Sequence, residues 1–343
     1  MSMAAILRRT LRLLVVSALY YSGVLPLWFW LRRRLARGQV LVLGFHRVLP
    51  EEAFRQSCSL DGILLTETTF ARMLAYLKPR FVFLTLEEFL ALRAGNGKTS
   101  RAACLLTFDD GWRDNYLTAY PWLKKLGVPS TIFLVTGMVN SSETFWVERL
   151  HEVWRDKIRR EEIRGFLASD LVAPQNGDFE GIIEYLKHMP AERREPILQR
   201  VIPARAVAEQ KETIDSILTW EQVRAMRNDG VDFGSHTHTH PLLTYENDEA
   251  IERELRVAKQ VLEERLAQPA RAFAYPNGTW DARVREHVKR TGYECAFTTE
   301  RGWSHPDEDS YSIRRVLLHE GAVTGLGGRF SPAMLLWTLV VRA

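Results

Sequence analysis

Seven short apolar runs constrain the fold of this chain more than any other feature of the sequence. In chain order they read QVLVLGF, ACLLTF, STIFLV, VDFGS, AFAY, CAFTT and IRRVLL, and turns or helical patterns separate them. One such helical pattern is predicted over Asp248–Leu266, where apolar residues recur on one face. Strands that alternate with helices form a largely parallel sheet, and seven of them favour an α/β barrel. A chain of 343 residues is long enough for one domain of that size.

Polar and ionisable residues follow five of these runs. They are His46, Asp109–Asp110, His236, Pro276–Asn277 and His319. In barrels of parallel strands, the loops after the carboxyl ends of the strands carry the active site. We therefore expect these residues to meet at one end of the barrel.

The paired acids lie in TFDDGWRDNY, residues 107–116, directly after a buried run. Two adjacent carboxylates repel each other, so the pair indicates a metal site or an acid/base role. GSHTHTHP, residues 234–241, adds three histidines in five positions. On a helical turn His236 and His240 point the same way and reach one ion, while His238 faces elsewhere.

Two imidazoles and one carboxylate leave open positions around a metal ion. Such a site suits metal-assisted hydrolysis better than a closed structural zinc site. One of the paired acids then completes the metal ligands, and the other serves as general base.

These residues resemble the polysaccharide deacetylases of carbohydrate esterase family 4, whose domain is also called the NodB homology domain. The resemblance runs from about Val40 to His319 and rests on TFDDGW, SHTHTH and FAYPNG in the same order. It implies a distorted (β/α)7 barrel that hydrolyses an acetyl group from an amino sugar. It also implies one divalent ion, with zinc expected and cobalt or nickel as alternatives.

The resemblance also assigns residues by motif position. Asp109 is the expected base, and Asp110, His236 and His240 are the expected metal ligands. The hydroxyl of Thr237 is expected to brace the loop between the two histidines.

Three further assignments concern departures from the family pattern. The frequent arginine position of FAYPNG is Ala274 here, and the aromatic position after the proline is Asn277. Arg315, at the start of RVLLH, is either a replacement that orients Asp109 or an ordinary surface arginine. Tyr275 and the backbone N–H of Asn277 are assigned to the substrate and its oxyanion.

Two histidines remain to be placed. LLH, ending at His319, has the form of the family's last motif, so His319 is the expected general acid. His46, in LGFHRV, is expected to support the site without binding the metal.

The N-terminus carries a long apolar segment. Leu13–Leu31 contains 19 residues without a charge, just long enough to cross a bilayer at about 1.5 Å per residue. Arginines flank it on both sides: Arg8, Arg9 and Arg12 before it, and Arg32, Arg33, Arg34 and Arg37 after it. With no cleavage site following, we expect residues 1–37 to be a retained anchor in the bacterial cytoplasmic membrane. The flanking charges do not decide on which side of the membrane residues 38–343 lie.

A helical insertion is expected between the third and fourth runs, over about residues 141–216. Trp146, Leu150, Val153 and Trp154 recur there at helical spacing. The aromatic side chains of this insertion either fill helix interfaces or form a platform for a sugar.

Composition limits the kinds of partner that this chain is expected to bind. The net charge of +4 arises partly from the N-terminal arginines, and no nucleic-acid-binding motif is present, so no nucleic-acid partner is expected. We predict a membrane-associated, metal-dependent hydrolase that removes an N-acetyl group from a polysaccharide or a lipid-linked glycan. The alternatives are an O-deacetylase, a deformylase of a lipid-linked sugar, and an inactive glycan-binding relative. The basic N-terminus and the apolar tail PAMLLWTLVV, which is too short to span a bilayer but can lie in its interface, favour a lipid-linked acceptor.

Overall fold

The computed structural model describes residues 3–36, 38–99, 101–141, 143–169, 178–202 and 213–341. Arg37, one of the predicted basic flanks, lies outside the described residues, as do parts of the insertion expected over 141–216.

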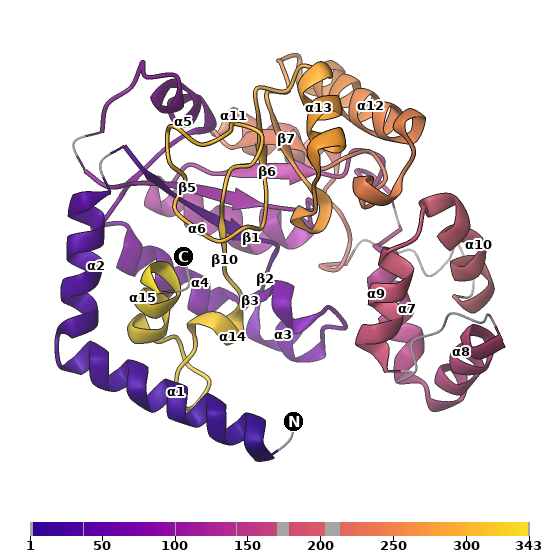
Figure 1. Ribbon diagram of the computed structural model, residues 1–343, viewed down its shortest axis with the longest axis horizontal. Coiled ribbons are helices and arrows are strands. Elements are labelled where there is room, and N and C mark those ends of the chain that lie inside the picture. Colours follow the sequence, from indigo (N-terminus) through magenta and orange to yellow (C-terminus); the bar gives the residue numbers. More distant parts are fainter. Residues whose placement is uncertain are drawn as a thin grey trace.

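A curled parallel sheet forms the centre of the molecule (Figure 1). Its order is β10-β1-β5-β6-β7-β8-β9, and β4 pairs with β5 beside this path. The strands of this sheet are β1 (Val40–Phe45), β4 (Val82–Phe83), β5 (Ala103–Phe108), β6 (Thr131–Leu134), β7 (Asp232–Ser235), β8 (Ala272–Ala274), β9 (Cys295–Phe297) and β10 (Val316–Leu317). A short separate pair consists of β2 (Arg47–Leu49) and β3 (Leu64–Thr66).

Each of the seven apolar runs contains one strand of the main path, so the prediction of a parallel α/β sheet is confirmed. One parallel bridge, between Phe297 and Ile313, links β9 to the segment that leads into β10. The two ends of the curled sheet therefore approach each other, and the sheet forms a half-barrel. The sequence analysis missed β4, β2 and β3, which are too short to show a periodic pattern.

The register of the sheet brings the predicted site residues to one edge. β1 and β5 pair from Val40 with Ala103 to Phe45 with Phe108, and all twelve residues are buried. Parallel strands buried on both faces read as continuous apolar runs, which explains the sequence pattern. β6 and β7 end together through the pair Leu134 and Ser235. The residues that follow these strands thus share the carboxyl edge.

Helices cover the sheet and extend beyond it. The helices are α1 (Met3–Tyr21), α2 (Val24–Leu35), α3 (Glu51–Gln56), α4 (Glu67–Leu77), α5 (Leu86–Arg93), α6 (Tyr120–Leu126), α7 (Trp146–Arg155), α8 (Lys157–Ser169), α9 (Phe179–Lys187), α10 (Ala191–Val201), α11 (Trp220–Asn228), α12 (Asp248–Leu266), α13 (Ala282–Arg290), α14 (Glu320–Val323) and α15 (Pro332–Val340). The bounds of α12 are those predicted, because Asn247 caps its first turn and Ile251, Leu255 and Leu262 bury one face.

The N-terminal segment does not form the single span expected over Leu13–Leu31. The chain breaks at Gly23, whose φ of 82° is left-handed, and α1 and α2 meet at a bend of 72°. Figure 1 shows the two helices at an angle around α15. Among the described residues no single helix is long and apolar enough to cross a bilayer. The bent pair Leu7–Tyr21 and Val24–Leu35 passes that test together, by length and composition only.

The C-terminal helix α15 is buried rather than interfacial. Leu335, Leu336 and Leu339 are fully buried and belong to the same apolar cluster as Val16 and Phe29 of the N-terminal helices. The expectation that PAMLLWTLVV lies in a membrane interface is therefore wrong, because α1 and α2 cover this helix.

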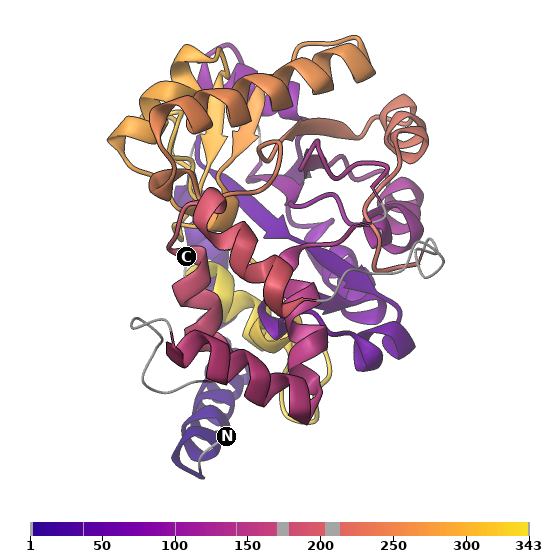
Figure 2. The ribbon, with the colours of Figure 1, turned by 90° about the vertical axis from the view of Figure 1, so that its right-hand side faces the viewer.

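The excursion between β6 and β7 contains α7, α8, α9 and α10, which face the viewer in Figure 2. These helices share a separate apolar cluster that includes Leu150, Trp154, Ile183, Leu186 and Leu198. Trp154 therefore fills a helix interface, one of the two roles considered for the aromatic side chains.

Candidate active site

Three side chains with metal-binding atoms meet at the carboxyl edge of the sheet. Asp110 follows β5, while His236 and His240 follow β7. One oxygen of Asp110, Oδ1, lies 3.5 Å from Nε2 of each histidine. All three ligand atoms lie within 4.8 Å of one another, which is close enough to surround one ion.

The two histidines are held in the form that binds a metal. Nδ1 of His236 lies 2.7 Å from the carbonyl oxygen of Ala274, which only accepts, so Nδ1 donates and Nε2 keeps its lone pair toward Asp110. Burial lowers the pKa of His236 to about 4 and that of His240 to about 3, so both rings are neutral near pH 7. The residues present therefore fit a divalent ion held by two nitrogens and one oxygen.

The segment from His236 to His240 is a loop and not the helical turn expected from the spacing. Thr237 and His240 both have left-handed backbones, with φ of 67° and 66°. The Thr237 hydroxyl donates to the carbonyl of His236 and accepts the N–H of His240 at 2.9 Å, so it braces the loop. His238 turns away, and its Nδ1 lies 3.0 Å from the hydroxyl of Thr136.

Glu254, on α12, forms hydrogen bonds with the backbone of this loop. The sequence did not indicate this role. Oε2 of Glu254 accepts the backbone N–H groups of His238 and Thr239, each at 2.8 Å. Glu254 lies three residues after Ile251, on the apolar face of α12. An acidic residue on a buried helix face was the signal that would have found it.

Left-handed backbone gathers at this site. The described residues contain six non-glycine positions with positive φ, and four of them are Asp110, Thr237, His240 and Asn277. Such conformations cost on the order of 1–3 kcal/mol each and persist only where surrounding contacts hold them. Gly111 continues the turn with φ of 74°, and a Cβ there would lie 2.7 Å from a methyl group of Leu134.

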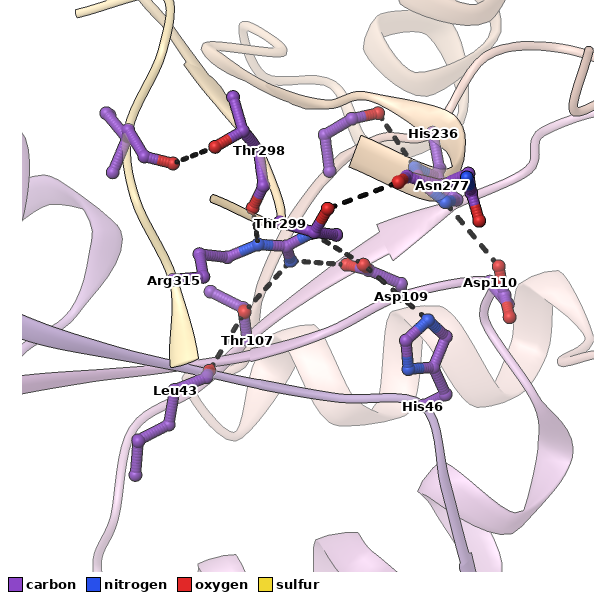
Figure 3. Close-up of polar contacts among 12 residues, drawn as sticks. Leu43, His46, Thr107, Asp109, Asp110, His236, Asn277, Thr298, Thr299 and Arg315 are labelled. Atoms are coloured by element: carbon purple, nitrogen blue, oxygen red, sulfur yellow. Dashed lines mark hydrogen bonds and ion pairs between the residues drawn. The ribbon is translucent and has the colours of Figure 1, made fainter. Parts of the chain in front are cut away.

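Asp109 does not face the two histidines as Asp110 does; it pairs with Arg315 (Figure 3). The two guanidinium NH groups donate to the two carboxylate oxygens at 2.7 Å each, and Arg315 is 0% exposed. Nε of Arg315 donates to the carbonyl of Thr298 at 2.8 Å, which fixes the plane of the guanidinium. Arg315 is therefore no surface residue, and of the two readings its placement beside Asp109 is the one found.

The charge state of Asp109 follows from this pair. Burial by itself raises the pKa of the Asp109 carboxyl, but the charge and hydrogen bonds of Arg315 outweigh burial and hold that pKa well below its usual range. Asp109 is thus ionised at all physiological pH values.

Trp112, in the DDGW motif, positions the metal-binding carboxylate. Its Nε1 donates to Oδ2 of Asp110 at 3.0 Å, leaving Oδ1 toward the histidines. The guanidinium of Arg47 lies 4.2 Å above the Trp112 ring, and Nε of Arg47 is paired with Asp114 at 2.8 Å. The sequence analysis assigned no role to these residues, because nothing in their spacing shows that β2 brings Arg47 over the ring.

The two histidines outside the metal group differ in position. His46 follows β1 and lines the cavity above the metal group, with Nε2 3.9 Å from Oδ2 of Asp109. His319 precedes α14 and is not among the residues that line this cavity.

The assignment of Tyr275 to the substrate is wrong. Its backbone N–H donates to Phe297 at 3.0 Å, its hydroxyl donates to the carbonyl of Tyr311 at 2.9 Å, and its ring is fully buried. Asn277 does line the cavity, with a φ of 56°.

Two groups of residues form most of the cavity wall. Strand ends supply His46, Asp110, His236, His240 and Asn277. The insertion helices supply Trp146, Val147, Glu148, Lys187 and Arg194. The insertion helices therefore line the same cavity as the metal-binding residues, and their Trp146 is one of its aromatic side chains, with Trp112 and Phe145.

The comparisons with known proteins agree on one family. The model of the family described as polysaccharide deacetylase matches residues 96–296. YxkH of Bacillus subtilis (strain 168) is 23% identical over 251 residues, which cover 73% of this chain and only 64% of that protein. A poly-β-1,6-N-acetyl-D-glucosamine N-deacetylase of Staphylococcus epidermidis is 22% identical over 303 residues, 83% of this chain and 81% of that protein.

Solved structures share the fold. The deacetylase PplD of Streptococcus pyogenes superposes with a TM-score of 0.58 at 20% identity, covering 88% of this chain and 98% of that one. IcaB of Ammonifex degensii gives a TM-score of 0.55 at 21% identity, covering 82% and 91%.

Proposed function

The chain belongs to the polysaccharide deacetylase family, and we propose that it is a zinc-dependent hydrolase that removes the N-acetyl group from an amino sugar. The observation that carries this proposal is the placement of an ionised Asp109 next to Asp110, His236 and His240. Within a distorted (β/α)7 barrel, this arrangement supports a base and a metal-binding group at one strand edge.

Each residue has a role that its contacts support. A divalent ion held by Asp110, His236 and His240 would acidify water and polarise the acetyl carbonyl. Asp109, kept charged and oriented by Arg315, accepts the proton of the attacking water. Asn277 lies at the cavity wall, where its backbone N–H is proposed to donate to the oxyanion.

We assign the proton donor for the leaving nitrogen to His46 rather than to His319. His46 lines the cavity and lies 3.9 Å from Asp109, so it faces the same bound substrate as the base. Placing the proton donor at His46 and not at His319 is the main change from the roles expected by motif position.

The substrate class is an N-acetylated glycan. The staphylococcal relative is named for poly-β-1,6-N-acetyl-D-glucosamine, which makes a β-linked amino sugar polymer one candidate. A lipid-linked glycan is the other, and the N-terminal helices favour it.

We propose that α1 and α2 attach the protein to the cytoplasmic membrane along its surface. One side of the pair is buried against the domain through Leu13, Val16, Leu25 and Phe29. Large apolar side chains on the pair remain exposed: Leu7, Leu11, Leu14, Val15, Tyr21, Val24, Leu27, Trp28, Trp30, Leu31 and Leu35. Exposed apolar side chains beside arginines are typical of a helix that lies in the membrane interface.

The proposed activity is tested by acetate release from zinc-loaded protein. The panel contains poly-β-1,6-N-acetyl-D-glucosamine, chitin oligosaccharides, lipid-linked N-acetyl sugars and O-acetylated glycans. We expect acetate from an N-acetylated glycan, and Asp109→Asn should abolish the release while the protein keeps its metal. Release from O-acetylated glycans alone would contradict N-deacetylation and favour the O-deacetylase alternative.

A further inference from the structure

The insertion helices place charged side chains in the cavity that the proposed hydrolysis does not use. Lys187 on α9 and Arg194 on α10 line the same cavity as His236 and His240. Neither residue contacts Asp109 or belongs to the metal-binding group.

Arg194 is buried, and no carboxylate in the described part of the chain pairs with it directly. The residue is 6% exposed, and the Nε atom of its guanidinium has no hydrogen-bond partner. The ring of Trp146 lies 5.1 Å from the guanidinium carbon. The charges of Glu246 and Glu195 raise the pKa of Arg194, but burial outweighs them and lowers that pKa. Burial of a guanidinium is costly unless an anion pairs with it, so this arrangement calls for a negative charge from outside the chain.

Two carboxylates near Arg194, those of Glu246 and Glu148, contact other groups. Oε1 of Glu246 accepts the backbone N–H of Ala191 at 2.8 Å, at the start of α10. Glu148, on α7, also lines the cavity. The pKa of its carboxyl depends on burial, on the Ser59 hydroxyl and on Arg47. Burial raises the pKa of Glu148 to about 7, so near neutral pH much of it carries no charge to offset Arg194.

Lys187 adds a second positive charge to this wall. Its ammonium is 3.4 Å from Glu184, three residues earlier on the same helix, and the Glu184 side chain is mostly exposed. The Lys187 side chain is 19% exposed, and a pair with a mostly exposed carboxylate contributes little, so Lys187 can turn toward a ligand.

We propose that Arg194, assisted by Lys187, binds a negatively charged group that the substrate carries beside its acetylated amino sugar. The substrate is then an anionic glycan, with a phosphate or a carboxylate next to the reacting sugar, and not a neutral homopolymer. The planar fork of arginine binds two oxygens of either group. This inference rests on the proposed function of the metal site, since it describes the substrate of that site.

The structural alternative is that Arg194 only packs on Trp146 and holds α10 against α7. The two explanations differ in what a substitution changes. A packing role predicts lower stability with no preference for charged ligands. A binding role predicts a loss of that preference in a folded protein.

Binding to metal-free protein tests the proposal, because phosphate then has no metal to coordinate. Isothermal titration would compare N-acetylglucosamine 1-phosphate, N-acetylmuramic acid and neutral N-acetylglucosamine. We expect at least one anionic probe to bind roughly ten-fold or more tightly than the neutral sugar, as charged hydrogen bonds allow. The stronger of the two probes identifies phosphate or carboxylate as the group recognised.

The variants Arg194→Gln and Arg194→Lys examine the residue itself. Arg194→Gln should remove the preference, and Arg194→Lys should restore part of it. Arg193→Gln is the matched control, because it removes an exposed positive charge from the same helix. A thermal melt of each variant would show that it is folded.

Two results would overturn the proposal. In one, wild-type protein binds all three probes equally. In the other, Arg194→Gln and Arg193→Gln bind the anionic probes alike. Failure of the proposed function gives a different result, because acetate release would then be absent while the anionic preference at Arg194 persists.

Discussion

Replacing Arg315 with methionine removes the guanidinium that pairs with the proposed base. Methionine keeps much of the buried volume but leaves the Asp109 carboxylate without its two hydrogen bonds of 2.7 Å. Burial, which raises the pKa of this carboxyl, is then opposed only by the charges of His236 and His46. Loss of a close opposite charge typically raises a carboxyl pKa by about 1–3 units.

The shift should appear in the pH dependence of acetate release. In wild-type protein Asp109 stays ionised far into the acidic range, so its protonation does not limit the rate near neutral pH. In Arg315→Met the acidic limb of kcat/KM should move upward by about one unit or more, with kcat lowered and metal content unchanged. Arg315→Lys keeps the charge but not the two-point geometry, and should give a smaller shift.

Stability supplies an independent measure of the same pair. Leaving one partner of a buried ion pair typically costs about 3–5 kcal/mol. Asp109→Asn removes the stranded charge, so the double variant Asp109→Asn with Arg315→Met should be destabilised by less than the sum of the single variants. An unmoved acidic limb together with additive stability changes would refute the reasoning and leave Asp109 without an identified orienting group.

Three further predictions concern the metal site and the membrane. His240→Ala should lose most of the bound zinc in metal analysis, whereas His238→Ala, in the same loop, should keep it; equal retention would remove His240 from the ligands. In metal-free protein, His236 has a pKa of about 4 in place of 6.5, so the unfolded state binds more protons between these values. His236 alone should therefore lower the stability by about 3 kcal/mol as pH drops from 6.5 toward 4, and His240, with a pKa of about 3, adds to this loss; urea unfolding that is flat over this range would contradict the burial argument. Leu27→Ser with Trp28→Ser should shift the protein out of the membrane fraction, and unchanged detergent-dependent release would argue against attachment through α2.

The sequence predicted the parallel sheet because buried parallel strands have continuous apolar runs, and it predicted the meeting of Asp110, His236 and His240 because strand ends share an edge. The absence of an arginine at Ala274 made Arg315 one candidate partner of Asp109, but only the structure chose between that role and an ordinary surface arginine. These features depend on local pattern and topology.

The rest depends on tertiary contacts that no local pattern records. The turn at Gly23 follows from packing of α1 and α2 on α15, which converts an apolar span into a bent pair. The left-handed loop at His240 depends on Thr237 and on Glu254 from a distant helix. The charge of Arg194 in the cavity requires the insertion to fold over the strand ends, which helical periodicity alone does not show.

Anomalous diffraction from crystals of the zinc-bound protein would locate the metal relative to the two adjacent acids. We expect one zinc ion at ligand distances of about 2.0–2.2 Å from Asp110, His236 and His240. Asp109 should lie outside this coordination sphere and remain paired with Arg315. Zinc bound by Asp109 instead of Asp110, or absent from these residues while present elsewhere, would contradict the assignment of both the metal ligands and the base.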